Sequence, residues 1–397
     1  MLYPDRASSG PYLDSAHGNY TGSSPYGVLR TSLSTPPNDY GRGNCAHCHE
    51  QHASIGGAEP APTGGPDKYA LFYTNHVSQT DNFCFKCHDN TTTYAATAIK
   101  NYTYSYRAGA CPAATCSEDD ILQVFTYGPP TSTTTSSHRL DDIKTFINGK
   151  WNYTADSNPC GGCHNPHRAQ GDPANSTLTK SSITRGWPVS RPSQHIKDNN
   201  AWGLWGDNLL TATERMSNYV GALTYQAPYR YYTTTPSSLE PQGNALTDNT
   251  TAAASTTDFV TFCTDCHHYS PTPVSTRLGN TNLRDINWET SVHGKVDSYF
   301  SSDISERDAP YNVTKNYVLS CTDCHEPHGS PNYCYLIRKE VNGATTSFTG
   351  DTRAAWDSLC NWCHTSHVSS HKGSQDCSNC HYHGATQWQS GESHPIF

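Results

Sequence analysis

The sequence predicts a mostly irregular coil with short helices and few strands, folded around something other than an aliphatic core. Only 34% of its 397 residues are hydrophobic, and only 15% are charged, so the chain lacks the apolar surface that a protein of this length normally buries. Its 25 prolines and 29 glycines interrupt regular structure throughout. The residue types in excess are the 17 cysteines and 21 histidines, and their spacing indicates what organises the interior.

The pattern Cys-x-x-Cys-His occurs seven times and uses 14 of the 17 cysteines. Positions i, i+3 and i+4 share one face of a helical turn, so two thiols can attach one haem while the adjacent histidine binds its iron. Zinc ribbons and redox disulfides also use paired cysteines, but seven copies, each followed at once by histidine, favour covalent haem. The sequence therefore predicts a haem-organised multihaem cytochrome fold with seven haems c. The thioether cysteines and proximal histidines are Cys45, Cys48 and His49; Cys84, Cys87 and His88; Cys160, Cys163 and His164; Cys263, Cys266 and His267; Cys321, Cys324 and His325; Cys360, Cys363 and His364; and Cys377, Cys380 and His381.

The second axial ligand of most irons is expected to be histidine as well. The chain has only two methionines, Met1 and Met216, whereas 14 histidines lie outside the seven proximal positions. Four of these follow a motif by three residues. The two axial ligands of one iron lie on opposite faces of the porphyrin, so a histidine leaving the same short segment is expected to bind a neighbouring haem. The alternative is a surface or structural role. These four are His52, His167, His328 and His367.

Five further histidines are candidate distal ligands, which makes nine candidates for seven places. At least two of the nine are therefore not ligands unless a site is shared. The five are His17, His76, His138, His293 and His371. His195 and His394 are weaker candidates. His47, inside a motif, and His268 and His383, just after one, are interpreted as bystanders.

The uneven spacing of the motifs excludes a regular solenoid and predicts one elongated unit over residues 1–397. Residues 169–259 carry no motif and are expected to form covering loops. Short helices are expected around the motifs, the best of them over Asp351–His364 with Asp351 as its cap. Three cysteines remain outside the motifs, and two of them are expected to pair in an oxidising compartment. They are Cys111, Cys116 and Cys334.

The composition also argues against two classes of partner, nucleic acid and the membrane interior. A net charge of −9 argues against nucleic acid, and no apolar run reaches the length of a membrane helix. The N-terminus does not have the pattern of a signal peptide, so an exported chain is expected to be numbered here from a processed form. Irons with both axial positions filled have no open position for substrate. No catalytic residue is therefore predicted, and electron transfer is favoured over catalysis.

The first motif and its tail, Cys45–Gly57, resemble the first haem site of outer-surface cytochromes of the OmcS and OmcE type. Further matches lie at Cys160–His167, Cys321–His328 and Leu359–His364, whereas the seventh motif departs from the six-haem members of that family. The resemblance implies an extracellular or cell-surface protein that polymerises head to tail into a conductive filament, a cytochrome nanowire. It implies that His52 ligates a haem of the adjacent subunit.

In such a filament, electron donor and acceptor proteins or extracellular minerals would be the other partners. The main alternative is a discrete periplasmic or cell-surface electron carrier. A multihaem reductase is less favoured, because such an enzyme needs an iron with an open face and all seven motifs are standard.

Overall fold

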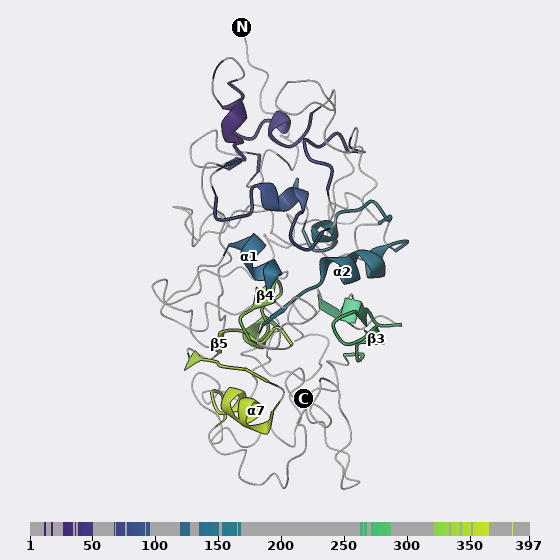
Figure 1. Cartoon of the computed structure of the whole chain (residues 1–397), viewed down its shortest axis with the longest axis vertical. Coiled ribbons are helices and arrows are strands. Elements are labelled where there is room, and N and C mark those ends of the chain that lie inside the picture. Colours follow the sequence, from purple (N-terminus) through teal and green to yellow (C-terminus); the bar gives the residue numbers. More distant parts are fainter. Residues whose placement is uncertain are drawn as a thin grey trace, which may run out of the picture. The chain divides into compact units, whose positions relative to one another are not determined.

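The structure is a computed structural model, shown in Figure 1. It describes residues 12, 17–18, 27–34, 36, 39–50, 67, 69–75, 78–91, 93–95, 120–127, 135–150, 153–164, 166–167, 263–264, 266–267, 271–286, 321–332, 335–341, 344–350, 352–364 and 383. The chain divides into two compact units, which are described separately. Unit 1 comprises Met1–Lys100, Asp120–Leu122 and Ile143–Ala222, and unit 2 comprises Asn101–Asp119, Gln123–Asp142 and Leu223–Phe397.

Among its described residues, unit 1 has four short 3-10 helices, and three of them open a Cys-x-x-Cys-His motif. Each of these three begins after an asparagine whose side chain accepts a hydrogen bond from a backbone N–H of the first turn. Asparagine is a favoured N-cap because its side-chain oxygen satisfies an amide that has no partner within the helix. The bounds are η1 Thr31–Leu33, η2 Cys45–His47, η3 Phe83–Lys86 and η4 Pro159–Gly162.

In the part of unit 2 that the structure describes, there are three two-stranded antiparallel sheets and two helices. The sheets pair β1 (Ser136–Ser137) with β4 (Gly329–Ser330), β2 (Val274–Ser275) with β3 (Thr281–Asn282), and β5 (Glu340–Val341) with β6 (Ala344–Thr345). The helices are α6 (Cys321–Cys324) and α7 (Arg353–Cys360). Two more helices, α1 (Ile121–Thr126) and α2 (Leu140–Ile147), include the points where the chain passes between the units.

The β1–β4 pair matters most for the site, because His138 directly follows β1 and His328 directly precedes β4. Ser136 pairs with Ser330 and Ser137 with Gly329, and the ladder continues where His138 N–H donates to the His328 carbonyl at 3.1 Å. A Cβ at position 329 would lie 2.1 Å from the Val124 carbonyl oxygen. Only glycine allows this close approach, which fixes the backbone just after His328.

Helix α7 differs from the predicted helix at both ends. It spans Arg353–Cys360, and its N-cap is Thr352, whose hydroxyl accepts from Ala355 N–H at 3.3 Å. The prediction that Asp351 caps the helix is therefore wrong. A threonine hydroxyl serves the same purpose as a carboxylate, because either oxygen can satisfy a free amide of the first turn.

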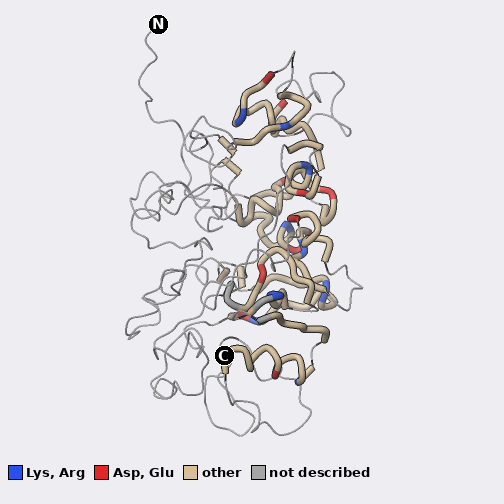
Figure 2. The backbone as a smooth tube through the Cα atoms, turned by 90° about the vertical axis from the view of Figure 1, so that its left-hand side faces the viewer, with Lys and Arg blue, Asp and Glu red and all other residues tan. Residues whose placement is uncertain are grey.

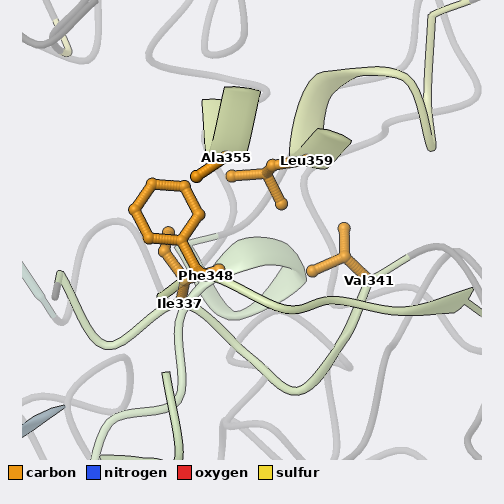
Figure 3. Packing of buried hydrophobic residues seen from close by; sticks show 5 residues of the cluster. All are labelled: Ile337, Val341, Phe348, Ala355 and Leu359. Carbon is orange, nitrogen blue, oxygen red and sulfur yellow. The ribbon is translucent and has the colours of Figure 1, made fainter. Parts of the chain in front are cut away.

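The apolar core of unit 2 is a small cluster in which the face of α7 packs on the β5–β6 region (Figure 3). Phe348 is completely buried, and its ring contacts that of Trp356 edge to face at 4.9 Å. The cluster consists of Ile337, Val341, Phe348, Ala355 and Leu359. A core of this size agrees with the predicted mostly irregular chain with short helices and few strands. The elongated single unit stays a prediction, and residues 169–259 lie outside the described residues.

Charged residues are scattered along the described backbone with both signs interspersed (Figure 2). The most deeply buried ion pair joins Arg30 and Glu50 in unit 1, with nitrogen and oxygen 2.8 Å apart. Among the described residues, no helix is long and apolar enough to cross a bilayer.

Candidate functional site

The described haem motifs fold as the helical turn that their spacing predicts. In the five motifs whose turn bonds are described, the N–H of the motif histidine donates to the carbonyl of the first cysteine at 2.8–2.9 Å. This bond closes one turn, so the three side chains of a motif leave from the same short segment. None of the twelve motif cysteines that the structure describes is joined in a disulfide.

Two motif histidines are held by the same second contact. The Nδ1–H of His49 donates to the Tyr69 carbonyl at 3.0 Å, and that of His325 donates to the Tyr335 carbonyl at 2.6 Å. A ligating histidine commonly donates one ring nitrogen to a carbonyl, which fixes the tautomer and leaves the other nitrogen for the metal. In both residues Nε2 is therefore the nitrogen available for iron.

Four motif histidines each lie opposite a histidine from outside the Cys-x-x-Cys-His motifs, at nearly constant distance. An imidazole nitrogen binds a metal ion at about 2.0 Å and the ring centre lies about 1.2 Å behind it, so two imidazoles on opposite sides of one ion have centres about 6.3 Å apart. The observed values match this separation. They are 6.1 Å for His17 and His88, 6.2 Å for His49 and His167, 6.2 Å for His138 and His267, and 6.1 Å for His325 and His383.

Two of the opposing histidines are oriented by equivalent carbonyls in the two units. In unit 1, His17 Nδ1–H donates to the Pro166 carbonyl at 2.7 Å. In unit 2, His138 Nδ1–H donates to the Pro327 carbonyl. Both prolines stand between the two histidines of a Cys-His-x-Pro-His sequence. The same kind of contact thus holds Nδ1 of both histidines.

Burial keeps at least one imidazole of each opposed pair electrically neutral at physiological pH. It lowers the pKa of His88 and His383 to about 3 and that of His167 and His267 to about 4. In all four, the second cause is the charge that the opposed imidazole would carry if protonated. Neutral imidazole is the form that binds metal, and each opposed pair contains one of these four rings.

Three of the candidate distal histidines lie opposite a motif histidine, namely His17, His138 and His167. His167 follows the third motif but lies opposite His49 of the first, and its binding to a neighbouring haem stays a prediction. His328 lies beside the Phe125 ring at 5.5 Å, with its Nδ1 4.0 Å from Glu326 Oε1. The other candidates lie outside the described residues. They are His52, His76, His293, His367 and His371, with the weaker His195 and His394 and the seventh-motif residues Cys377, Cys380 and His381.

His383, which the sequence analysis interpreted as a bystander, also lies close to a motif histidine. Its ring lies opposite that of His325 and nearly perpendicular to it, at 73°. It was missed because it follows the seventh motif by two residues and not three. The available signal was the sequence Cys-His-x-His, which also lets the second histidine leave its own motif for another haem site.

His47 is a bystander, as predicted. Its Nδ1 accepts from Arg30 N–H at 3.1 Å, and its Nε2–H donates to the Gly41 carbonyl at 3.0 Å. Both ring nitrogens are thus occupied by the backbone, which leaves neither for a metal.

The donor set fits haem better than it fits zinc. A structural zinc ion takes four protein ligands, whereas haem iron takes four nitrogens from its porphyrin and needs two from the protein. The part of the chain that the structure describes contains no cluster of three or more His, Cys, Asp or Glu side chains suited to a metal ion. It contains opposed histidine pairs instead.

Comparison of the chain with protein-family models, curated proteins and solved structures found no match.

Proposed function

We propose that this protein is an exported electron-transfer protein with seven covalently attached haems c, nearly all with two histidine ligands. The observation that carries the proposal is the four opposed histidine pairs. Each combines one Cys-x-x-Cys-His histidine with one histidine from elsewhere in the chain, at 6.1–6.2 Å. Chance packing of histidines would not select one motif member for every pair.

The residues that would hold the haems follow from this arrangement. The paired cysteines would form the thioethers, and the motif histidine and its opposed histidine would be the axial ligands. When bound, such groups supply one-electron oxidation and reduction. The protein's own contribution is to fill both axial positions, which excludes substrate from the metal, and to hold the ligands with carbonyls such as those of Tyr69 and Tyr335.

The test is the haem load of the secreted protein. Intact mass under denaturing conditions should show seven covalent haem additions, and the ferrous protein should bind carbon monoxide poorly. Five or fewer haems would contradict the proposal. Stoichiometric carbon monoxide binding at several haems would support the reductase alternative, and turnover of nitrite or hydroxylamine would support it further.

We extend the proposal to a filament on the strength of the resemblance around Cys45–Gly57. A head-to-tail contact that does not close gives an open filament, and ligation by His52 of a haem in the next subunit would join haems and subunits by the same bond. Electron donor and acceptor proteins or extracellular minerals would meet such a filament at the cell surface. The alternative is a discrete periplasmic or cell-surface carrier.

Electron microscopy of the purified protein separates these two forms. The wild type should form filaments, whereas His52→Ala should keep seven haems, expose one iron per chain to carbon monoxide and lose or weaken filaments. His47→Gln is the matched control, because His47 is a neighbouring histidine with both nitrogens bonded to backbone. Normal filaments from the His52 variant would contradict the role of His52.

A further inference from the structure

The second and third motifs of unit 1 are joined by a pair of asparagine side chains, one buried and one half-buried. Asn158 Nδ2–H donates to Asn82 Oδ1 at 2.9 Å, and Asn82 Nδ2–H donates in return to Asn158 Oδ1 at 3.5 Å. Asn82 is completely buried. A reciprocal amide pair removed from water is costly to break, because each lost bond leaves a buried polar atom unsatisfied.

Each asparagine of this pair also holds the first cysteine of its own motif. Asn82 Oδ1 accepts from Cys84 N–H at 3.0 Å, and Asn158 Oδ1 accepts from Cys160 N–H at 2.9 Å. Both are N-caps, of η3 and η4. The amide pair therefore couples the position of Cys84 to that of Cys160, which lies 76 residues later in the chain.

The amide pair also reaches the first sulfur of the second motif. Asn158 Nδ2–H lies 3.6 Å from Cys84 Sγ, while Asn158 Oδ1 accepts from Cys160 N–H. The cap of the third motif thus lies directly against an attachment sulfur of the second.

A second contact ties the same two motifs together at the axial-ligand side. His17 lies opposite His88 of the second motif and donates to the carbonyl of Pro166, two residues after His164 of the third. The second and third motifs are therefore fixed to each other through both the cysteine and the histidine of the second site.

We propose that Asn82 and Asn158 are positioning residues that hold the second and third haems as a closely coupled pair. The inference rests on the proposed haem attachment. Electron exchange within such a pair moves one electron from one iron to the other, and no covalent bond changes. Its rate falls steeply with the separation of the two groups, so holding the two attachment segments next to each other favours fast transfer at this step.

Serine substitution separates this bridge from helix capping. Serine is a good N-cap, but its short hydroxyl cannot span to the other asparagine. Asn158→Ser should therefore keep η4 and lose the bridge. Asn158→Asp is a second variant, which keeps the size and the capping oxygen but has no Nδ2–H to donate. Asn44→Ser is the matched control, because Asn44 caps η2 by accepting from Ala46 N–H at 2.9 Å.

The readout is circular dichroism in the Soret band, where closely spaced haems give an exciton couplet. With seven haems by mass, both Asn158 variants should lose part of the couplet amplitude, and Asn44→Ser should retain it. An unchanged couplet in both Asn158 variants would overturn the positioning role while leaving the haem count intact. Fewer than six haems in the wild type would instead contradict the proposed function. The two failures are thus distinguishable.

Discussion

The first and fifth motifs hold their motif histidine with the same backbone turn. The side chains that pack behind this turn differ between the two. The first-motif segment is residues 45–50 with 69–72, and the fifth-motif segment is residues 321–326 with 335–338. In both, the glutamate after the motif histidine donates its N–H to a carbonyl, at 2.6 Å for Glu50 to Ala70 and 2.8 Å for Glu326 to Leu336. Ala70 and Leu336 both have positive φ, 54° and 55°, a conformation that non-glycine residues rarely adopt.

The two segments differ in what packs behind them. In the first, Arg30 lies over the Phe72 ring at 4.2 Å and pairs with Glu50. In the fifth, Ile337 joins the apolar cluster around Phe348. The same ligand-holding turn is thus supported by a buried ion pair in one unit and by hydrophobic packing in the other. The backbone bonds define the site, and the interior needs only to keep water away from them.

Removal of haem is expected to have the largest effect on stability. It should unfold both segments, so that they no longer differ. Neither the ion pair nor a five-residue cluster supplies the free energy of unfolding of an ordinary core, so both segments should depend on the bound groups as metal-organised domains do. Protein expressed without haem-attachment machinery should be unfolded or degraded. A cooperative thermal transition of the haem-free chain would contradict this expectation.

Loss of a distal histidine should affect one segment at a time. His167→Ala should open the first-motif site, and His383→Ala should open the fifth, each adding one equivalent of carbon monoxide binding to the ferrous protein. His383→Met should keep the iron six-coordinate and raise the reduction potential of one haem. His47→Gln should bind no additional carbon monoxide, and the role of His383 is disproved if its alanine variant behaves the same way.

Substitutions in the ion pair and in the apolar cluster should destabilise the protein for different reasons. The loss at the ion pair should be recovered by a second substitution at its partner. Arg30→Met leaves the Glu50 charge buried and should lower the free energy of unfolding by about 3–5 kcal/mol, whereas the double variant Arg30→Met/Glu50→Leu should regain most of that loss. Phe348→Ala should also cost about 3–5 kcal/mol, through its cavity. Denaturant unfolding measures all three.

The exposed Leu278→Ala is the control for these variants, and a change below about 0.5 kcal/mol is expected for it. A double variant as unstable as Arg30→Met alone would show that the first-motif interior depends on the ion pair for more than charge compensation.

The smallest expected difference is spectroscopic. The rings of His49 and His167 are nearly parallel, at 3°, whereas those of His325 and His383 cross at 73°. Parallel imidazole planes separate the energies of two iron d orbitals, and perpendicular planes leave them close. Electron paramagnetic resonance of the ferric protein should therefore show a rhombic low-spin signal that His167→Ala removes. A signal with a large maximum g value should lose intensity in His383→Ala and not vanish, because the rings of His17 and His88 also cross at a steep angle, 82°. Loss of the same signal in both variants would contradict the angles.

The motif residues could be predicted from the sequence because their chemistry depends on local spacing. His17, His138 and His167 could be proposed as ligands, but their partners could not, because the opposed histidines come from distant segments. Two local signals were misread or overlooked. The cap of α7 moved from Asp351 to Thr352 because both can accept the same amide. The Asn-x-Cys sequences at Asn82 and Asn158 predict caps, whereas their pairing depends on tertiary structure.

The carbonyl that orients His17 comes from a residue 149 positions later in the chain, and the one that orients His138 from a residue 189 positions later. A ribosome completes His17 and the whole second motif well before Pro166 exists. His17 therefore acquires its contact with Pro166 only when the third motif has been made, and His138 acquires its contact with Pro327 only with the fifth. Each Cys-His-x-Pro-His sequence thus orients a histidine that was made before it. A chain truncated between the second and third motifs would carry His17 without the contact that directs it.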